Sequence, residues 1–145
     1  MAERTSSTIT IDAAPAEVMA VIAGFEGYPE WTGEVKETEV LEVDDKTGRA
    51  VRVRFRLDAG TIRDEHVLGY TWDGDREVRW TLVTSQMLKA LDGCYALSAN
   101  GGGGTEVTYE LTVDVKIPML GMIKRKAEKV IIDRALTGLK KRVES

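Results

Sequence analysis

Hydrophobic and polar residues alternate with a period of two over most of the chain, from residue 34 to residue 116. In the clearest example, Val51, Val53, Phe55 and Leu57 alternate with arginines and an aspartate. Such alternation is typical of a strand with one face on a core and the other in water. Turn residues interrupt the pattern at short intervals, which predicts separate strands. The expected strands span residues 7–11, 35–43, 51–58, 62–72, 78–84, 88–99 and 105–116.

Two other segments have helical spacing. The first helix is expected to begin after Asp12, whose side chain can cap it, with Pro15 in the first turn. Its apolar face consists of Val18, Val21, Ile22 and Phe25. A longer helix is expected over residues 119–144, after Pro118 ends the last strand. The apolar faces of its two halves are offset, so its ends face different surroundings or the helix bends.

The order of elements is strand, helix pair, six strands and a long helix, which predicts an α+β fold in a single domain, residues 1–145. We expect a seven-stranded antiparallel sheet, curved around the C-terminal helix, with an apolar pocket between them. On the outer face, the arginines of residues 51–58 are expected to pair with Glu37, Glu39 or Glu42 of the preceding strand.

The composition narrows the range of possible functions. Hydrophobic residues make up 43% of the chain and charged residues 30%, as in ordinary globular proteins, and the net charge of −4 argues against a nucleic-acid partner. No apolar run is long enough to span a bilayer, and the first residues lack an apolar signal core, so a cytoplasmic location is expected. The only cysteine, Cys94, and the only histidine, His66, cannot build a structural zinc site. We expect neither a metal nor a cofactor.

Short motifs in a consistent order resemble the START-like, helix-grip (SRPBCC) superfamily. Residues 11–22 resemble the segment joining its first strand to its first helix, and residues 28–31 its Tyr-Pro-x-Trp loop. Residues 80–83 are similar to its x-Trp-x-Leu strand. The remaining motifs are a hairpin, Gly93–Leu97 with Gly104–Tyr109, and the end of the last helix, Ala135–Lys140. Together they cover almost the whole chain.

The branch that the sequence resembles is that of polyketide cyclases/dehydrases and lipid-transport proteins. The resemblance implies a helix-grip fold that holds a hydrophobic ligand such as a lipid, a sterol or an aromatic polyketide. Tyrosine hydroxyls can orient a ligand carbonyl, and methionines adapt to irregular guests. The candidate ligand-binding residues are Tyr28, Trp31, Phe55, Leu68, Tyr70, Trp80, Tyr95, Tyr109, Met119, Met122, Ile123, Ala127 and Ile131. For each of them, simple core packing is the alternative.

Asp64 and His66 are the candidates for acid–base catalysis, because they share one strand face with Leu68 and Tyr70. If that face points inward, the pair can act as an oriented base. Alternatively, the strand end is solvated and both side chains lie at the surface, or an irregularity reverses the alternation. We favour the solvated interpretation and assign no catalytic residue.

Three functions remain open. We favour a binder or carrier of a small hydrophobic molecule over a polyketide cyclase/dehydratase (aromatase), and place a protein-interaction or stress-related regulator third. The last helix is basic, which suits peripheral contact with an anionic membrane or an acidic partner. We favour the interpretation that the basic face of this helix is simply solvated, with its positive charge balanced by Glu128, Asp133 and Glu144. A monomer and a homodimer are both compatible with the sequence.

Overall fold

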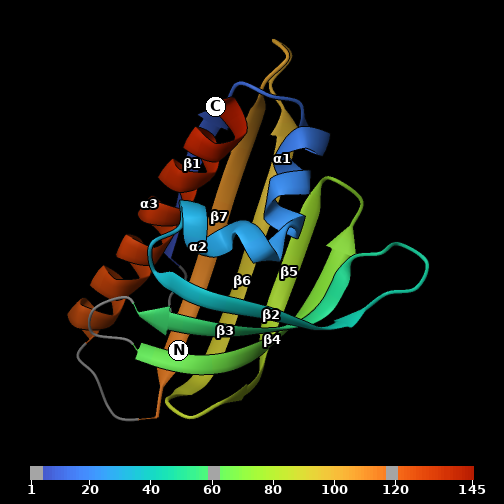
Figure 1. Cartoon of the computed structure of the whole chain (residues 1–145). Helices are drawn as coiled ribbons and strands as arrows, with labels where there is room; N and C mark the ends of the chain where they lie inside the picture. Colours follow the sequence, from blue (N-terminus) through green and yellow to red (C-terminus); the bar gives the residue numbers. More distant parts are fainter. Residues whose placement is uncertain (1–4, 59–62, 117–120) are drawn as a thin grey trace.

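The predicted order of elements is confirmed in a computed structural model, which describes residues 5–58, 63–116 and 121–145. The strands are β1 (Thr5–Ile11), β2 (Val35–Val43), β3 (Ala50–Asp58), β4 (Arg63–Asp73), β5 (Glu77–Ser85), β6 (Leu88–Ala99) and β7 (Thr105–Val115). The helices are α1 (Pro15–Ala23), a 3₁₀ turn η1 (Phe25–Gly27), α2 (Tyr28–Trp31) and α3 (Gly121–Glu144). Figure 1 shows all of them along the chain.

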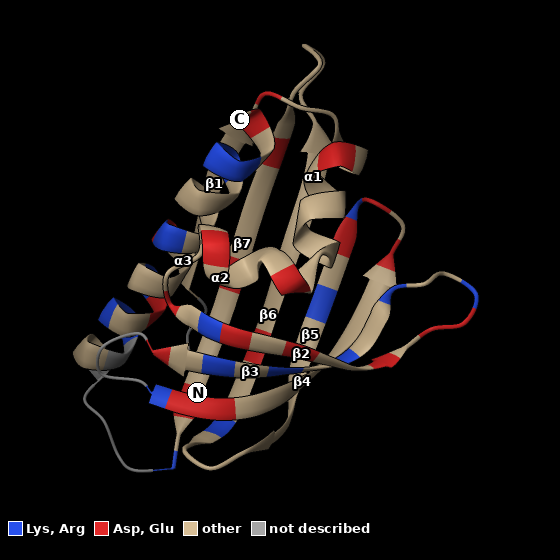
Figure 2. Ribbon diagram, viewed as in Figure 1, with Lys and Arg blue, Asp and Glu red and all other residues tan. Residues whose placement is uncertain are grey.

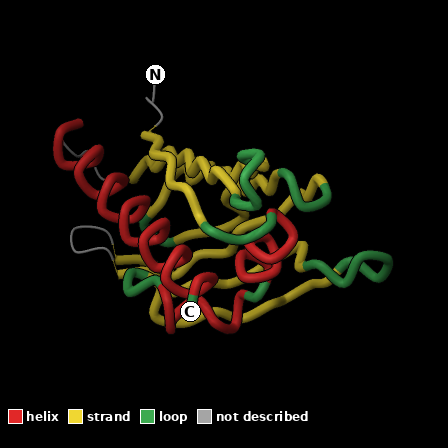
Figure 3. Tube along the Cα trace, turned by 90° about the horizontal axis from the view of Figure 1, so that it is seen from above, coloured by secondary structure: helices red, strands yellow, loops and turns green. Residues whose placement is uncertain are grey.

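The strands form one antiparallel sheet in the order β1-β7-β6-β5-β4-β3-β2. The first strand therefore completes the sheet beside the last one, and the other strands follow one another as a meander. Figure 1 shows β2, β3 and β4 crossing β6 and β7 at a steep angle, so the sheet curves strongly. The helices lie on its concave side, as Figure 3 shows from above. This arrangement is the predicted α+β fold.

The C-terminal half of α3 anchors the helix to the core. Ile132, Leu136 and Leu139 are almost completely buried. Gly138 permits a close approach to α2, because a Cβ at this position would lie 1.7 Å from the carbonyl oxygen of Trp31. Only glycine fits here, so the contact between α2 and α3 depends on this residue.

One helix boundary differs from the prediction. Ala14, not Asp12, is the N-cap of α1, and no side chain caps the helix. Pro15 occupies the first helical turn, so the chain enters the helix two residues later than expected. The N–H of Asp12 instead donates to the Glu144 carboxylate at 2.8 Å. This bond ties the start of α1 to the end of α3.

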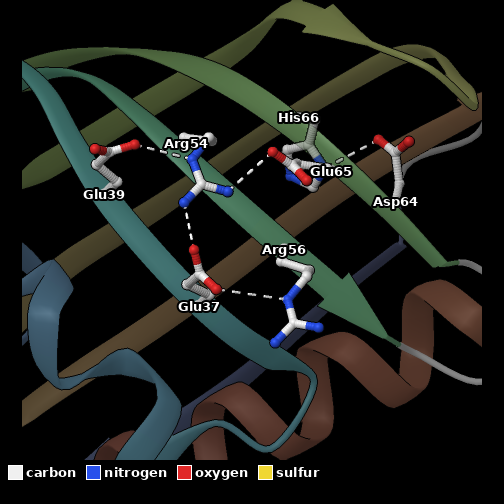
Figure 4. A network of polar contacts seen from close by, with 7 residues as sticks. All are labelled: Glu37, Glu39, Arg54, Arg56, Asp64, Glu65 and His66. Carbon is white, nitrogen blue, oxygen red and sulfur yellow. Dashed lines mark hydrogen bonds and ion pairs between the residues drawn. The ribbon is translucent and has the colours of Figure 1, made fainter.

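Charged residues recur along β2, β3 and β4 (Figure 2), and in β3 they alternate with the buried residues. Arg54 of β3 forms ion pairs with Glu37 and Glu39 of β2 and with Glu65 of β4, as Figure 4 shows. The pairs with Glu37 and Glu39 confirm the sequence prediction. The hydrogen bond from Arg54 lowers the pKa of Glu37. Exposed pairs of this kind add little stability, but they keep the charged face outward and hence turn the alternate residues inward.

Candidate functional site

A cavity of about 70 Å³ lies between the concave face of the sheet and the helices α2 and α3. Every lining residue except His66 is apolar or aromatic, and every one except Val35 is buried. The lining consists of Tyr28, Val35, Phe55, Leu57, His66, Leu68, Tyr70, Trp80, Leu91, Tyr95, Tyr109, Leu111 and Ile131. A cavity with such a lining favours an apolar guest over water.

The strand alternation brings these side chains together. Residues two apart project from the same face, and the register places Tyr70 opposite Trp80, and Tyr95 opposite Tyr109. The ring centres of Tyr95 and Tyr109 are 4.5 Å apart. The indole of Trp80 lies across Gly93, where a Cβ would come within 2.2 Å of the ring. Gly93 is therefore required for the position of the Trp80 side chain.

Four tyrosines give this apolar cavity its polar groups. Burial raises the pKa of Tyr28, Tyr70, Tyr95 and Tyr109, so all four stay neutral at physiological pH. The Tyr28 hydroxyl donates to the carbonyl of Ile22. Among the described residues, the other three hydroxyls have no hydrogen-bond partner, yet no fully enclosed side-chain oxygen is without one. These three hydroxyls are therefore not fully enclosed, and their residues line the cavity, so they are candidate donors to a guest.

Asp64 and His66 form a buried pair at the edge of the cavity (Figure 4). His66 is 3% exposed and the Asp64 side chain 1%. The Nδ1 atom of His66 lies 3.2 Å from Oδ2 of Asp64. Asp64 also accepts hydrogen bonds from the Ser85 hydroxyl and from the Met87 N–H, the latter at 3.0 Å. The solvated interpretation of this strand end was therefore wrong, because donors from the β5–β6 turn allow Asp64 to be buried.

This pair has a defined chemistry. Asp64 accepts a hydrogen bond donated by Nδ1–H of His66, so Nε2 carries a lone pair. Burial lowers the pKa of His66, and the nearby Asp64 carboxylate partly opposes this effect. The imidazole is therefore neutral at pH 7. Because His66 also lines the cavity, it can accept a proton or a hydrogen bond there.

Most of the predicted ligand-binding residues line the cavity, although binding by them stays a prediction. These are Tyr28, Phe55, Leu68, Tyr70, Trp80, Tyr95, Tyr109 and Ile131. Trp31 and Ala127 are buried but belong to the core rather than to the lining. Met122 and Ile123 lie away from the cavity and are 76% and 39% exposed, because the first turns of α3 leave the core. Met119 lies outside the described residues.

Four lining residues were not foreseen: Val35, Leu57, Leu91 and Leu111. Leu57 follows Phe55 by two positions and Leu111 follows Tyr109 by two. Strand alternation therefore indicated that both leucines face inward. Val35 starts the least regular strand, and Leu91 follows a register shift between β6 and β7. Alternation does not define which face these last two residues occupy.

No helix in the described ranges has both the length and the apolar character needed to cross a bilayer. A search among curated proteins finds no match to the chain. Residues 2–144 match the family model described as polyketide cyclase / dehydrase and lipid transport.

Solved structures share the fold at low sequence identity. A START superfamily protein from Mycobacterium smegmatis superposes with a TM-score of 0.89 at 20% identity, covering 97% of both chains. The Zhui aromatase/cyclase from Streptomyces sp. R1128 gives 0.80 at 14% identity, covering 99% of this chain and 94% of its own. A protein from Thermus thermophilus gives 0.80 at 23% identity, covering 98% of this chain and 97% of its own. The chain has the START-like fold and belongs to the polyketide cyclase/dehydrase and lipid transport family.

Proposed function

We propose that the protein binds a small, mostly apolar molecule that carries a hydrogen-bond acceptor such as a carbonyl. The observation that carries the proposal is the set of hydroxyls of Tyr70, Tyr95 and Tyr109, which belong to residues lining an apolar cavity and have no protein partner among the described residues. A polar group left unpaired in apolar surroundings is unfavourable, so a guest that accepts from these hydroxyls gains affinity. The raised pKa values keep the hydroxyls protonated as donors.

The size of the cavity restricts the guest. Sites for drug-sized ligands span roughly 300–1,000 Å³. The cavity here has a volume of about 70 Å³. An apolar cavity that holds benzene spans roughly 150 Å³. The cavity here therefore suits a short acyl chain, or one end of a longer or aromatic molecule whose remainder lies outside. Within the lipid, sterol and polyketide classes expected from the sequence, the proposal therefore favours small acyl or aromatic ketones over an intact sterol.

A matched pair of probes tests this proposal. Acetophenone combines one ring with a carbonyl, and ethylbenzene has nearly the same shape without an acceptor. Titration followed by NMR should show tighter binding of acetophenone. The variant Tyr70→Phe/Tyr95→Phe/Tyr109→Phe should lose that preference, by about tenfold, because it removes the donors and keeps the rings. Binding of neither probe, or an unchanged preference in the variant, would refute the proposal.

A cavity-filling variant locates the binding. Leu68→Phe adds volume to the lining of the cavity and should abolish the binding of both probes. Val83→Phe adds comparable bulk at a position of β5 that is exposed, and should leave binding unchanged. Equal effects of the two variants would place the probes elsewhere on the protein.

A cyclase or dehydratase is the second candidate, and the Asp64–His66 pair favours it. In a dehydration, Nε2 of His66 would remove a proton from the carbon next to a carbonyl held by the tyrosines. The imidazolium would then give this proton to the β-hydroxyl, which would leave as water as the double bond forms. The family description and the Zhui aromatase/cyclase are consistent with such chemistry.

The dehydration of 4-hydroxy-4-phenylbutan-2-one to its conjugated enone, followed by absorbance, distinguishes the two candidates. An enzyme should accelerate this reaction, and His66→Gln should abolish the acceleration while acetophenone still binds. Because burial lowers the pKa of His66, the activity should persist somewhat below pH 6.5. Binding of the ketone without any acceleration of its dehydration would favour the binding function over the enzyme.

A further inference from the structure

The first turns of α3 expose apolar side chains that the fold does not use. Met122 is 76% exposed, more than any other exposed large hydrophobic residue among those described, and Ile123 is 39% exposed. Both precede Ala127, where the helix begins to bury its inner face. In Figure 3 the end of α3 farthest from the C-terminus extends to one side of the strands.

Cations surround these apolar residues. Arg125, Lys126 and Lys129 are exposed and follow Met122 at spacings of three, four and seven, so all four share one helix face. Figure 2 shows Lys and Arg recurring along α3. The first turn contains no acidic residue. Glu128 does not neutralise this face, because its carboxylate turns inward to the Val113 N–H.

The packing of α3 on the sheet explains Lys129 but not Met122. The Lys129 ammonium donates to the Ser7 hydroxyl of β1 at 2.6 Å and forms an ion pair with Asp133 at 3.0 Å. Met122 is exposed and contributes no burial to the fold. Exposed apolar side chains beside cations therefore suit a surface outside the molecule.

We propose that this face, made of Met122, Ile123, Arg125, Lys126 and Lys129, docks on the surface of an anionic lipid bilayer. The helix would lie along the interface, with the apolar side chains reaching the boundary of the acyl chains and the cations at the headgroups. Long basic side chains suit this position, because their apolar stems cover hydrocarbon while their charges stay in water. The proposal does not depend on what the cavity binds.

Vesicle flotation tests it with the whole chain. The protein should float with vesicles of phosphatidylcholine containing about one third phosphatidylglycerol, not with phosphatidylcholine alone, and salt should weaken the binding. Lys126→Gln should reduce the affinity about fivefold. Met122→Ser should reduce it about tenfold, because one buried apolar side chain is lost. Lys141→Gln, at an exposed position near the other end of α3, is the matched control and should change little.

Several results would overturn the proposal: no flotation with anionic vesicles, equal flotation with neutral vesicles, or equal weakening by Lys141→Gln. Light scattering that shows a dimer dissociated by Met122→Ser would assign the face to a second copy of the chain instead. Acetophenone titration of Met122→Ser separates this proposal from that on the cavity. Unchanged ketone binding together with lost flotation is the expected result, and it also shows that the variant is folded.

Discussion

Asp64 and Glu128 are both carboxylates buried within the protein, but their surroundings differ. Glu128 is 0% exposed and accepts hydrogen bonds from the Thr5 hydroxyl and the Val113 N–H, both at 2.7 Å. Its donors belong to β1 and β7, so this carboxylate holds α3 against two adjacent strands. Asp64 accepts from the β5–β6 turn and also contacts His66, a cavity residue.

Glu128 is a structural carboxylate, whereas Asp64 can also affect the site through its contact with His66. Both donors of Glu128 are groups of the scaffold, so its loss should change stability and leave the cavity chemistry intact. One partner of Asp64 is the imidazole of His66, a residue that lines the cavity. Loss of Asp64 should therefore change both stability and the behaviour of His66.

The largest effect is expected for Glu128→Ala. It leaves the Val113 N–H without an acceptor and removes the bond to Thr5, so the free energy of unfolding should fall by about 3 kcal/mol in urea denaturation. Glu144→Ala, on the same helix but exposed, should cost less than about 1 kcal/mol. Similar losses in the two variants would contradict the structural role of Glu128.

A somewhat smaller loss, about 2 kcal/mol, is expected for Asp64→Ala, because the Met87 N–H and the Ser85 hydroxyl lose an acceptor. This variant should also shift the NMR signals of His66, the only histidine in the chain. Glu128→Gln should leave those signals in place. Movement of the His66 signals in both variants would remove the distinction between the two carboxylates.

Ser85→Ala should cost about 1 kcal/mol of unfolding free energy. The Ser85 hydroxyl donates to Asp64 and accepts from the Leu88 N–H at 2.8 Å, so it links the carboxylate to the start of β6. Asp64 keeps its bond from the Met87 N–H and its contact with His66 in this variant. The His66 signals should therefore move less than in Asp64→Ala, and an equal shift would give Ser85 a direct part in placing the imidazole.

The sequence predicted nearly all of the fold, because the alternation in strands such as β3 and β7 is regular and glycines mark the turns. The same alternation placed Tyr70 and Trp80 inside. It also placed Asp64 and His66 on the same face as Leu68 and Tyr70. It did not show why a charged group is tolerated there. That reason lies in donors at Ser85 and Met87, more than twenty residues away, which no local pattern reveals.

In helix α3, the helical pattern was misleading at some positions and contained an overlooked signal at another. Helical spacing grouped Ile123 with the inner face, and Met122 was a candidate for the pocket because methionines are adaptable. Whether these residues are covered depends on where the sheet ends, which is a tertiary property. Glu128 was assigned to the solvated face although it stands four positions before Ile132 and seven before Ala135, both buried. This spacing contained a signal for burial, which the charge of the residue obscured.

The smallest predicted effect is the pH dependence that arises from His66. Its pKa lies below the ordinary 6.5 in the folded protein, because burial disfavours the imidazolium. As the pH falls below 6.5, the unfolded chain takes up a proton before the folded one does, so stability decreases until the folded imidazole is also protonated. Urea denaturation between pH 7 and pH 5 should show this loss of stability, and His66→Gln should lack that contribution.

An NMR titration of His66 compares the two carboxylates directly. Asp64→Asn should lower the pKa of His66 further, because the favourable charge is lost. Glu128→Gln should leave the pKa of His66 unchanged. If the two variants shift it equally, the carboxylates act through the general stability of the fold and not through the contact between Asp64 and His66.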